Sequence, residues 1–163
     1  MITVLVNWPF APDMQERLRS GAGRDVRLVF VEDEEAARRE IANADVLLGG
    51  LTPALFPLAE RLKWVQSPLA GLEGRLFPQF IDSDILLTNA AGIYNEAIAD
   101  HIYALLLALT RDIPALLRAQ ARRHWLDRSE LEHEPQILAG RTLGIVGLGG
   151  IGAEVAKRAP VFG

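Results

Sequence analysis

"TLGIVGLGGIGAEVAKRAPVFG", residues 142–163, predicts a buried strand, a glycine turn and a helix in immediate succession. The turn "GLGGIG" matches the pattern G-x-G-x-x-G through Gly147, Gly149 and Gly152. In that pattern the first glycine permits a tight turn, the second lets backbone approach a pyrophosphate, and the third lets helix and strand pack closely. The amide groups and positive dipole of a helix N-terminus favour the same phosphates. The stretch therefore predicts the start of a dinucleotide-binding fold, although a glycine turn without a ligand is the alternative.

The choice between NAD and NADP depends on an acidic residue about twenty positions after the glycine turn, where it would bind the adenosine ribose. The sequence ends at Gly163, before that position. Both cofactors therefore remain open. Nothing near Gly163 predicts a natural terminus, and we expect a further strand to follow.

Upstream of the turn, five apolar runs start at intervals of roughly twenty residues, which leaves room for a helix between strands. Nearly continuous apolar runs are typical of parallel strands that are covered on both faces. The segments 12–20 and 32–44 are predicted to form helices. In the second segment, acidic residues occupy the first turn, where the helix dipole favours them. Residues 1–92 therefore predict an α/β unit with a doubly wound parallel sheet. The runs are Ile2–Asn7, Val26–Val31, Asp45–Gly50, Lys63–Ser67 and Ile85–Ala90.

A helical segment separates this unit from the glycine turn. Its apolar positions recur at helical spacing, Pro114 is expected to end or kink the first helix, and a second helix is predicted to extend to about Trp125. The polar stretch 127–137 predicts a connection. We therefore divide the chain into residues 1–92, 93–137 and 138–163. The apolar positions are Ile98, Ile102, Leu105, Leu106 and Leu109.

Composition limits the classes of function. Half of the 163 residues are apolar, the formal net charge is −4, and there is no cysteine. This balance argues against nucleic acid or an anionic membrane as a partner, and the lack of cysteine excludes disulfides, thiolate nucleophiles and cysteine metal sites. The N-terminus "MITVLVNWPF" does not resemble a signal peptide. We expect a soluble cytoplasmic protein.

Three loops leave the carboxyl ends of predicted strands, where open α/β sheets bind ligands. They are residues 49–53, 67–74 and 89–96, and each contains glycine. None of them carries a cluster of side chains suited to proton transfer. They offer backbone amides, especially around Ala70 and Gly71, which predict a nest for an anion such as a carboxylate. The alternative is that the glycines only make turns.

Other polar residues predict no second site. The histidines lack the spacing of metal ligands, so we predict no metal. Glu96 and Asp100 share a helical face that we expect to be exposed. Three arginines are expected to face solvent or a subunit partner. The histidines are His101, His124 and His133, and the arginines are Arg118, Arg122 and Arg123.

Four segments of the chain follow a pattern found together in one known family. They are "LKWVQSPLAGLEG" (62–74), "ILLTNAAGIYNEAIADHIYALLLALTR" (85–111), "RRHW" (122–125) and "LAGRTLGIVGLGGIGAEVAKRA" (138–159). Together they resemble the D-isomer-specific 2-hydroxyacid dehydrogenases, and most nearly the branch with glyoxylate and hydroxypyruvate reductases. The resemblance implies a flavodoxin-like substrate domain, a helical crossover, and a Rossmann domain of which this chain holds only the first β-α unit.

The resemblance also implies roles for individual residues. The substrate carboxylate is expected at the backbone of Ala70 and Gly71, with Gly50 and Leu51 beside it. Ile98 is expected near the nicotinamide. The family's catalytic arginine, glutamate and histidine are expected beyond residue 163, so no catalytic residue is assigned here. The residues expected against the pyrophosphate are Gly149, Gly150, Ile151 and Gly152, with Gly147 at the turn.

Two positions depart from the family pattern. Gly150 stands where a small polar residue is usual, and Pro160 stands where the helix normally continues, which predicts an early end.

The expected function is NAD- or NADP-dependent interconversion of 2-oxo acids and D-2-hydroxy acids by a homodimer, with this chain alone inactive. One alternative is a non-catalytic binding or dimerisation module, in which the strand at 142–147 would lack sheet neighbours. Another is a different Rossmann enzyme, such as a formate or alanine dehydrogenase.

Overall fold

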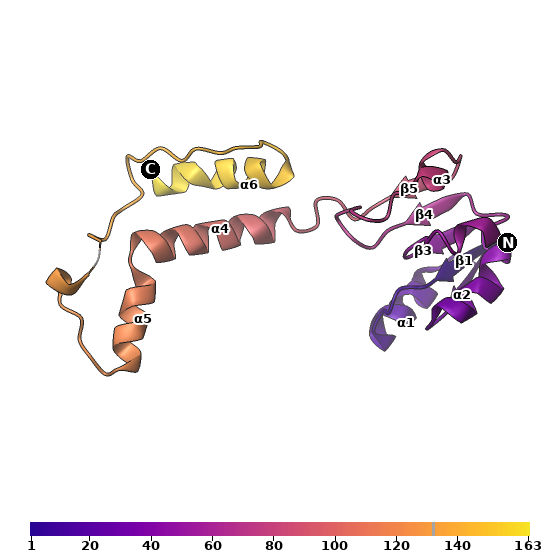
Figure 1. Ribbon diagram of the computed structural model, residues 1–163, viewed down its shortest axis with the longest axis horizontal. Helices are drawn as coiled ribbons and strands as arrows, with labels where there is room; N and C mark the ends of the chain where they lie inside the picture. Colours follow the sequence, from indigo (N-terminus) through magenta and orange to yellow (C-terminus); the bar gives the residue numbers. More distant parts are fainter. Residues whose placement is uncertain (132) are drawn as a thin grey trace. The chain divides into compact units, whose positions relative to one another are not determined.

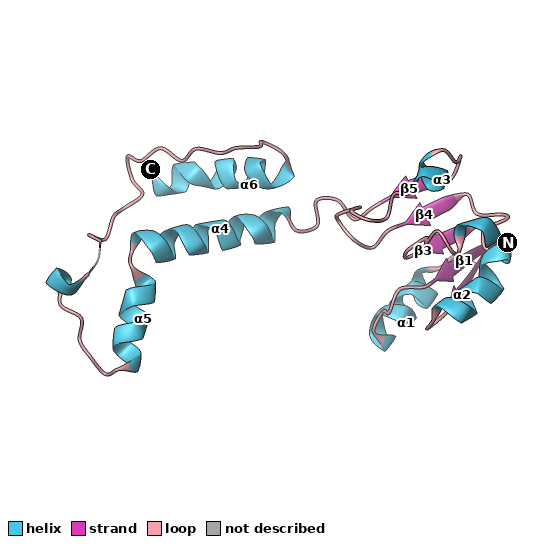
Figure 2. Cartoon of the chain, viewed as in Figure 1, coloured by secondary structure: helices cyan, strands magenta, loops and turns pink. Residues whose placement is uncertain are grey.

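The computed structural model describes residues 1–131 and 133–163, and these form two compact units. Unit 1 is Met1–Ala91, and unit 2 is Gly92–Gly163 (Figure 1). The described strands all belong to unit 1, whereas the long helix α4 and helices α5 and α6 belong to unit 2 (Figure 2).

Unit 1 is built on a five-stranded sheet with the order β2-β1-β3-β4-β5, and every neighbouring pair is parallel. Each of the five apolar runs forms one of these strands, which confirms the predicted α/β class. This strand order is that of flavodoxin-like folds. The strands are β1 (Ile2–Val6), β2 (Val26–Phe30), β3 (Val46–Leu48), β4 (Trp64–Gln66) and β5 (Leu86–Thr88).

Helices α1 (Pro12–Gly21), α2 (Glu34–Glu40) and α3 (Pro78–Ile81) complete unit 1. Helix α2 begins after Asp33, whose side chain accepts a hydrogen bond of 2.7 Å from the amide of Ala36. Such an N-cap satisfies an amide that has no partner inside the helix. The acidic first turn of α2, which the sequence analysis used, also suits the helix dipole.

The core of unit 1 is a row of apolar side chains that crosses the sheet. Leu5 of β1 is in register with Leu47 of β3, and Leu47 is in register with Val65 of β4. All three are buried, and they pack in one cluster with Ala37 and Ile41 beside α2. Burying each leucine stabilises the fold by about 1.5–3 kcal/mol. A one-residue slip of a strand would turn this row outward, so the row fixes the register and the positions of the loops.

Unit 2 contains α4 (Asn95–Thr110), α5 (Ile113–Ala121) and α6 (Gly150–Arg158). Asp112 adopts a left-handed conformation with φ 53°, and Pro114 lies in the first turn of α5, which confirms the predicted break. Helix α5 ends at Ala121, so its predicted extension to about Trp125 is wrong. Arg123 takes a left-handed conformation with φ 56°, which stops the helix.

Helix α6 ends at Arg158, and residues 159–162 form a short 3-10 helix that contains Pro160. This confirms the early end that Pro160 predicted. Proline tolerates the first turn of a helix but interrupts the hydrogen-bond ladder of a helix interior.

The predicted buried strand at residues 142–147 is wrong. The structure assigns no strand there, the side chain of Val146 is fully exposed, and only Ile145 is half-buried. A β-strand needs a neighbouring chain for its amides and carbonyls, and no described segment of unit 2 pairs with these residues.

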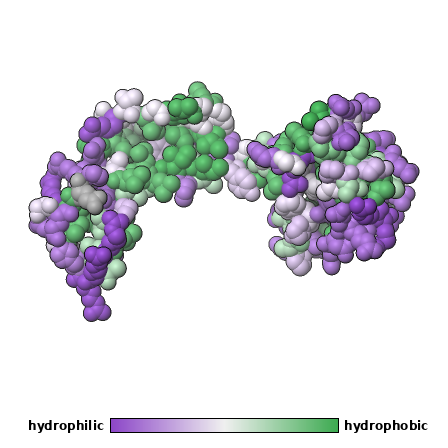
Figure 3. Space-filling view, in the orientation of Figure 1, coloured by the Kyte–Doolittle hydropathy of each residue, from purple (hydrophilic) through white to green (hydrophobic). Residues whose placement is uncertain are grey.

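Unit 2 exposes much apolar surface. Figure 3 shows apolar residues gathered over the α4 and α6 region, and Leu109 of α4 is 72% exposed. Among the described residues, no helix has both the length and the apolar character needed to cross a membrane.

Candidate functional site

The carboxyl edge of the sheet in unit 1 brings the ends of β1 and β3 together. Asn7, directly after β1, donates a hydrogen bond of 2.9 Å from Nδ2 to the carbonyl of Gly50. The amide of Gly50 donates a 3.0 Å bond back to Oδ1 of Asn7. This reciprocal pair fixes the backbone of the loop that follows β3.

Two successive glycines make this arrangement possible. Gly49 has φ 144°, and any Cβ at that position would overlap the side-chain oxygen of Asn7. A Cβ on Gly50 would lie 2.6 Å from Nη1 of Arg75. The side chains of Asn7 and Arg75 therefore occupy the space that the two glycines leave. Leu51 buries its side chain in the core cluster, so only its backbone is available at the predicted pocket.

The loop after β4 carries Ala70 and Gly71, the predicted carboxylate nest. It is held from the β5 side, because Asn89 donates a 2.6 Å hydrogen bond to the carbonyl of Ala70. The amide of Ala90 donates a 3.0 Å bond to the carbonyl of Leu69. Within the described chain, neither the amide of Ala70 nor that of Gly71 donates a hydrogen bond. Two adjacent amide donors thus have no partner among the described residues. The carboxylate of Glu73 lies over Gly71, where an added Cβ would overlap it, so an anionic ligand at these amides has to displace the Glu73 side chain.

Asn7 and Arg75 are residues that the sequence analysis missed. The loops named from the sequence end at Gly74, one residue before Arg75, and none of them follows β1. Asn7 directly follows a predicted apolar strand, and Arg75 directly follows a glycine-rich loop. Both positions could therefore have been predicted to lie at the ligand-binding edge of the sheet. Their contacts depend on the register of distant strands, which no local pattern contains.

The glycine turn of unit 2 has the geometry that a dinucleotide phosphate requires. Gly147 has φ 93°, Gly149 is the N-cap of α6, and a Cβ added at either would meet no atom within 4 Å. A Cβ on Gly152 would overlap the carbonyl oxygen of Gly147. The turn therefore leaves open space over the helix N-terminus and packs tightly beneath it, which fits a bound pyrophosphate.

The start of α4 lies beside the start of α6. A Cβ on Gly150 would overlap the side-chain amide of Asn95, so Asn95 fills the space that the usual polar side chain would take. Ile98, the residue expected near the nicotinamide, lies one turn further along α4 and is exposed. Ile151 is also exposed, on the first turn of α6.

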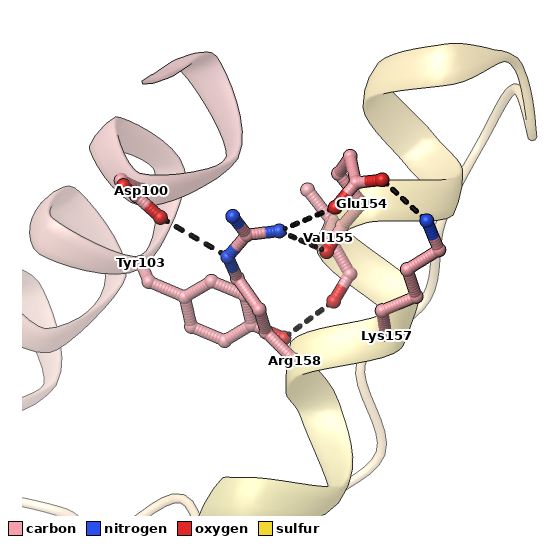
Figure 4. Close-up of polar contacts among 6 residues, drawn as sticks. All are labelled: Asp100, Tyr103, Glu154, Val155, Lys157 and Arg158. Atoms are coloured by element: carbon pink, nitrogen blue, oxygen red, sulfur yellow. Dashed lines mark hydrogen bonds and ion pairs between the residues drawn. The ribbon is translucent and has the colours of Figure 1, made fainter. Parts of the chain in front are cut away.

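Helices α4 and α6 are joined by a buried contact. The hydroxyl of Tyr103 donates a 2.8 Å hydrogen bond to the carbonyl of Val155 (Figure 4). The Tyr103 ring also stacks on Phe162, with centroids 4.8 Å apart. These contacts hold the glycine turn against α4.

Charged side chains surround this contact. Arg158 donates a 3.0 Å bond from Nε to Asp100 and a 2.9 Å bond from Nη1 to Glu154 (Figure 4). Hydrogen bonds from Lys157 and then from Arg158 hold the pKa of Glu154 below its usual value. Asp100, which was expected on an exposed polar face with Glu96, thus has a partner on α6.

The remaining candidates form no second site. His124 pairs with Glu130 at 2.9 Å. A backbone hydrogen bond from Asp127, followed by one from His124, lowers the pKa of Glu130. His101 and His133 are exposed. In the described ranges, no three histidine or acidic side chains gather as metal ligands would.

Comparison with known proteins identifies the NAD-binding part of the chain. Residues 103–163 match the family model described as D-isomer specific 2-hydroxyacid dehydrogenase, NAD binding domain. The family cofactor is therefore a nicotinamide dinucleotide, as the glycine turn predicted.

Curated relatives match a larger part of the chain. D-3-phosphoglycerate dehydrogenase of Methanocaldococcus jannaschii is 28% identical over 165 residues, which cover 100% of this chain and 31% of that protein. Glyoxylate reductase of Korarchaeum cryptofilum is 32% identical over 132 residues, which cover 76% of this chain and 39% of that protein. The chain thus spans less than half the length of these relatives.

A solved structure matches nearly the whole chain. It is a D-isomer specific 2-hydroxyacid dehydrogenase family protein from Aeromonas salmonicida, with a TM-score of 0.80 and 28% identity. The match covers 99% of this chain and 51% of that one. The family model, the curated relatives and this structure agree, and the chain is similar to the D-isomer specific 2-hydroxyacid dehydrogenase family.

Proposed function

We propose that this chain forms the substrate-binding and part of the cofactor-binding region of an NAD(P)-dependent oxidoreductase. The enzyme interconverts small 2-oxo acids and D-2-hydroxy acids of the glyoxylate or hydroxypyruvate type. One observation carries the proposal: the backbone amides of Ala70 and Gly71 donate no hydrogen bond within the described chain. They lie at the sheet edge where such folds bind ligands.

The substrate carboxylate binds to the amides of Ala70 and Gly71, with the backbone of Gly50 and Leu51 beside it. A hydrogen bond to a charged acceptor contributes about 1.5–3 kcal/mol. The amides are fixed through Asn89, so they need little reorganisation when the anion arrives. This preorganisation orients C2 of the acid for reaction.

The dinucleotide binds at the start of α6. Its pyrophosphate would be held by Gly149, Gly150, Ile151 and Gly152, after the turn at Gly147, and Ile98 would line the nicotinamide. The bound cofactor supplies or accepts hydride at C2 of the acid. The open space over Gly149 supports this role. Comparing turnover with NADH and with NADPH determines which of the two cofactors is preferred.

Reduction of a carbonyl also needs a proton donor for its oxygen. The described loops 49–53 and 67–75 of unit 1 contain no histidine or lysine. We therefore expect residues 1–163 alone to bind ligands but not to turn them over.

The charge of the carboxyl edge favours a small monoanion as substrate. Arg75 is the one cation and Glu73 the one acidic residue in the described loops 7–10, 49–53 and 67–75, so these loops carry no net positive charge. A phosphorylated acid carries more negative charge and calls for more cations. This favours a glyoxylate-like substrate over phosphoglycerate, although relatives of both names exist.

The test is turnover by the protein that the complete reading frame encodes. We expect NADPH or NADH oxidation with glyoxylate and hydroxypyruvate, and much slower NAD or NADP reduction with D-3-phosphoglycerate. Absence of turnover with every 2-oxo acid would contradict the proposal and favour a non-catalytic module. Faster turnover of phosphoglycerate would contradict the substrate assignment alone.

We also propose a homodimer. Apolar side chains on and after α5, including Leu117 and Trp125, are exposed, which supports association. Light scattering on the same protein is expected to give twice the mass of one chain. A monomer mass at micromolar concentration would contradict this part.

A further inference from the structure

Arg75 lies where three strand ends of unit 1 meet. It follows the loop after β4, yet its guanidinium reaches the loop after β3, with Nη1 2.6 Å from a Cβ built on Gly50. The guanidinium carbon is 5.8 Å from the centroid of the Trp8 ring, directly beyond β1. Arg75 thus spans the part of the sheet edge assigned to the substrate.

The local backbone holds Arg75 in this place. Gly74 has φ 70°, a left-handed conformation that glycine adopts readily, and the amide of Arg75 donates a 3.0 Å bond to the carbonyl of Leu72. Gly50 contributes no side chain, and Asn7 fixes its backbone. The turn at Gly74 therefore places the side chain of Arg75 in the space over Gly50.

The guanidinium of Arg75 forms no ion pair within the part of the chain that the structure describes. In the ranges 1–131 and 133–163, no carboxylate lies within ion-pair distance of it, whereas Arg61 pairs with Asp45 and Arg158 with Glu154. Arg75 is also half-buried, so water screens its charge less than at a fully exposed site. A half-buried arginine without an acidic partner is suited to bind an anion.

We propose that Arg75 binds the carboxylate of the 2-oxo or 2-hydroxy acid, together with the amides of Ala70 and Gly71. The planar guanidinium matches a carboxylate with two parallel hydrogen bonds, and Trp8 supports it through its ring face. The inference rests on the proposed function and adds a positively charged residue of unit 1 to the substrate site. It makes Arg75 a binding residue that determines selectivity for anionic substrates.

The test compares Arg75→Gln with the control Arg24→Gln in the protein of the complete reading frame. Arg24 is exposed near the amino end of β2, and its side chain makes no hydrogen bond or ion pair with the other described residues. We expect Arg75→Gln to raise the KM for glyoxylate about 10- to 100-fold, with a smaller change in kcat. Arg75→Lys should recover part of the loss because it keeps the charge. Arg24→Gln should match the wild type.

Two further readouts keep the inference separate from folding and from the proposed function. Circular dichroism is expected to give the same spectrum for both glutamine variants and the wild type. Oxalate, a dianion that does not react, is added in steps to the protein. Its binding is followed through the shifts of backbone amide signals in NMR spectra. Loss of oxalate binding in Arg75→Gln would support the inference even if no 2-oxo acid is turned over. Equal oxalate binding or equal KM in wild type and Arg75→Gln would overturn it, and so would absence of oxalate binding in the wild type.

Discussion

The run "ITVLV" of unit 1 and the run "TLGIV" of unit 2 have similar apolar sequences and different structures. The first forms β1, in which Leu5 and Val6 are buried between β2 and β3. The second forms no strand, and Val146 is fully exposed. The difference teaches that apolar β-forming residues make a strand only where neighbouring chain supplies hydrogen-bond partners and a covered face.

The two candidate binding regions differ in the same way. In unit 1, bonds between loops of different strands fix Gly50 and Ala70. In unit 2, helix packing through Tyr103 fixes the glycine turn, while the segment before the turn lies exposed. Unit 1 therefore depends on a buried core, and unit 2 depends on a few specific contacts.

The largest expected effect comes from the core of unit 1. Leu47→Ala should lower the free energy of unfolding by about 2–5 kcal/mol, because Leu47 is completely buried and the cavity cannot close fully. The matched change Leu109→Ala in unit 2 should alter it by less than about 0.5 kcal/mol, because Leu109 is 72% exposed. Urea unfolding measures both. Equal losses would contradict the contrast between the units.

The next effect concerns the glycine turn. Gly152→Ala would push a methyl group into the carbonyl of Gly147, which is backbone and must shift. Such overpacking costs about 1–3 kcal/mol, and we expect NADH affinity to fall about tenfold or more.

The control for this prediction is Gly144→Ala, because a Cβ there meets no atom within 4 Å. Quenching of NADH fluorescence gives both affinities. If the two variants bound NADH equally, the close packing under the turn would not matter for the cofactor.

A smaller effect is expected at the contact between α4 and α6. Tyr103→Phe removes the buried hydrogen bond to Val155 but keeps the stacking on Phe162. The loss should be about 1 kcal/mol, seen as faster amide hydrogen exchange in α6. The control Tyr94→Phe removes an exposed hydroxyl and should leave exchange unchanged. Unchanged exchange in Tyr103→Phe would show that apolar packing alone holds α6.

The smallest effect depends on pH and belongs to unit 1. A hydrogen bond from the amide of Thr3, then one from Arg61, lowers the pKa of Asp45. A lowered folded pKa means that the ionised carboxylate stabilises the fold above the unfolded value of about 3.9. That contribution is lost as the pH falls through the folded pKa.

Asp45→Asn should therefore be less stable than the wild type near neutral pH, and the difference should vanish in acid. Thermal unfolding of both proteins between about pH 7 and pH 2 measures it, because the lowered pKa of Asp45 places its titration below that of an unperturbed Asp. The control is Asp25→Asn, at an exposed carboxylate before β2. A difference that does not change with pH would contradict the role of the Asp45 charge.

Much of the fold could be predicted from local sequence, because apolar runs, prolines and glycines act within a few residues. The five strands and the breaks at Pro114 and Pro160 are of this kind. The end of α5 could not be predicted, because it depends on the left-handed backbone conformation of Arg123. Arginine has no preference for that conformation that the sequence would reveal.

The site was predicted in part for the same reason. The glycine turn is contained within one stretch of sequence, and its close packing at Gly152 follows the pattern. The contacts of Gly50 with Asn7 and Arg75 join separate strands, and they follow only once the order and register of the sheet are known. No backbone pattern indicated which side chains would fill the space over two glycines.

The most direct test of the central claim maps two ligands separately on the chain by amide shifts in NMR spectra. Oxalate should shift the amides of Gly50, Ala70 and Gly71 in unit 1. NADH should shift residues 149–153 of unit 2. Shifts from both ligands in one unit, or none from either, would contradict the assignment of substrate to unit 1 and cofactor to unit 2.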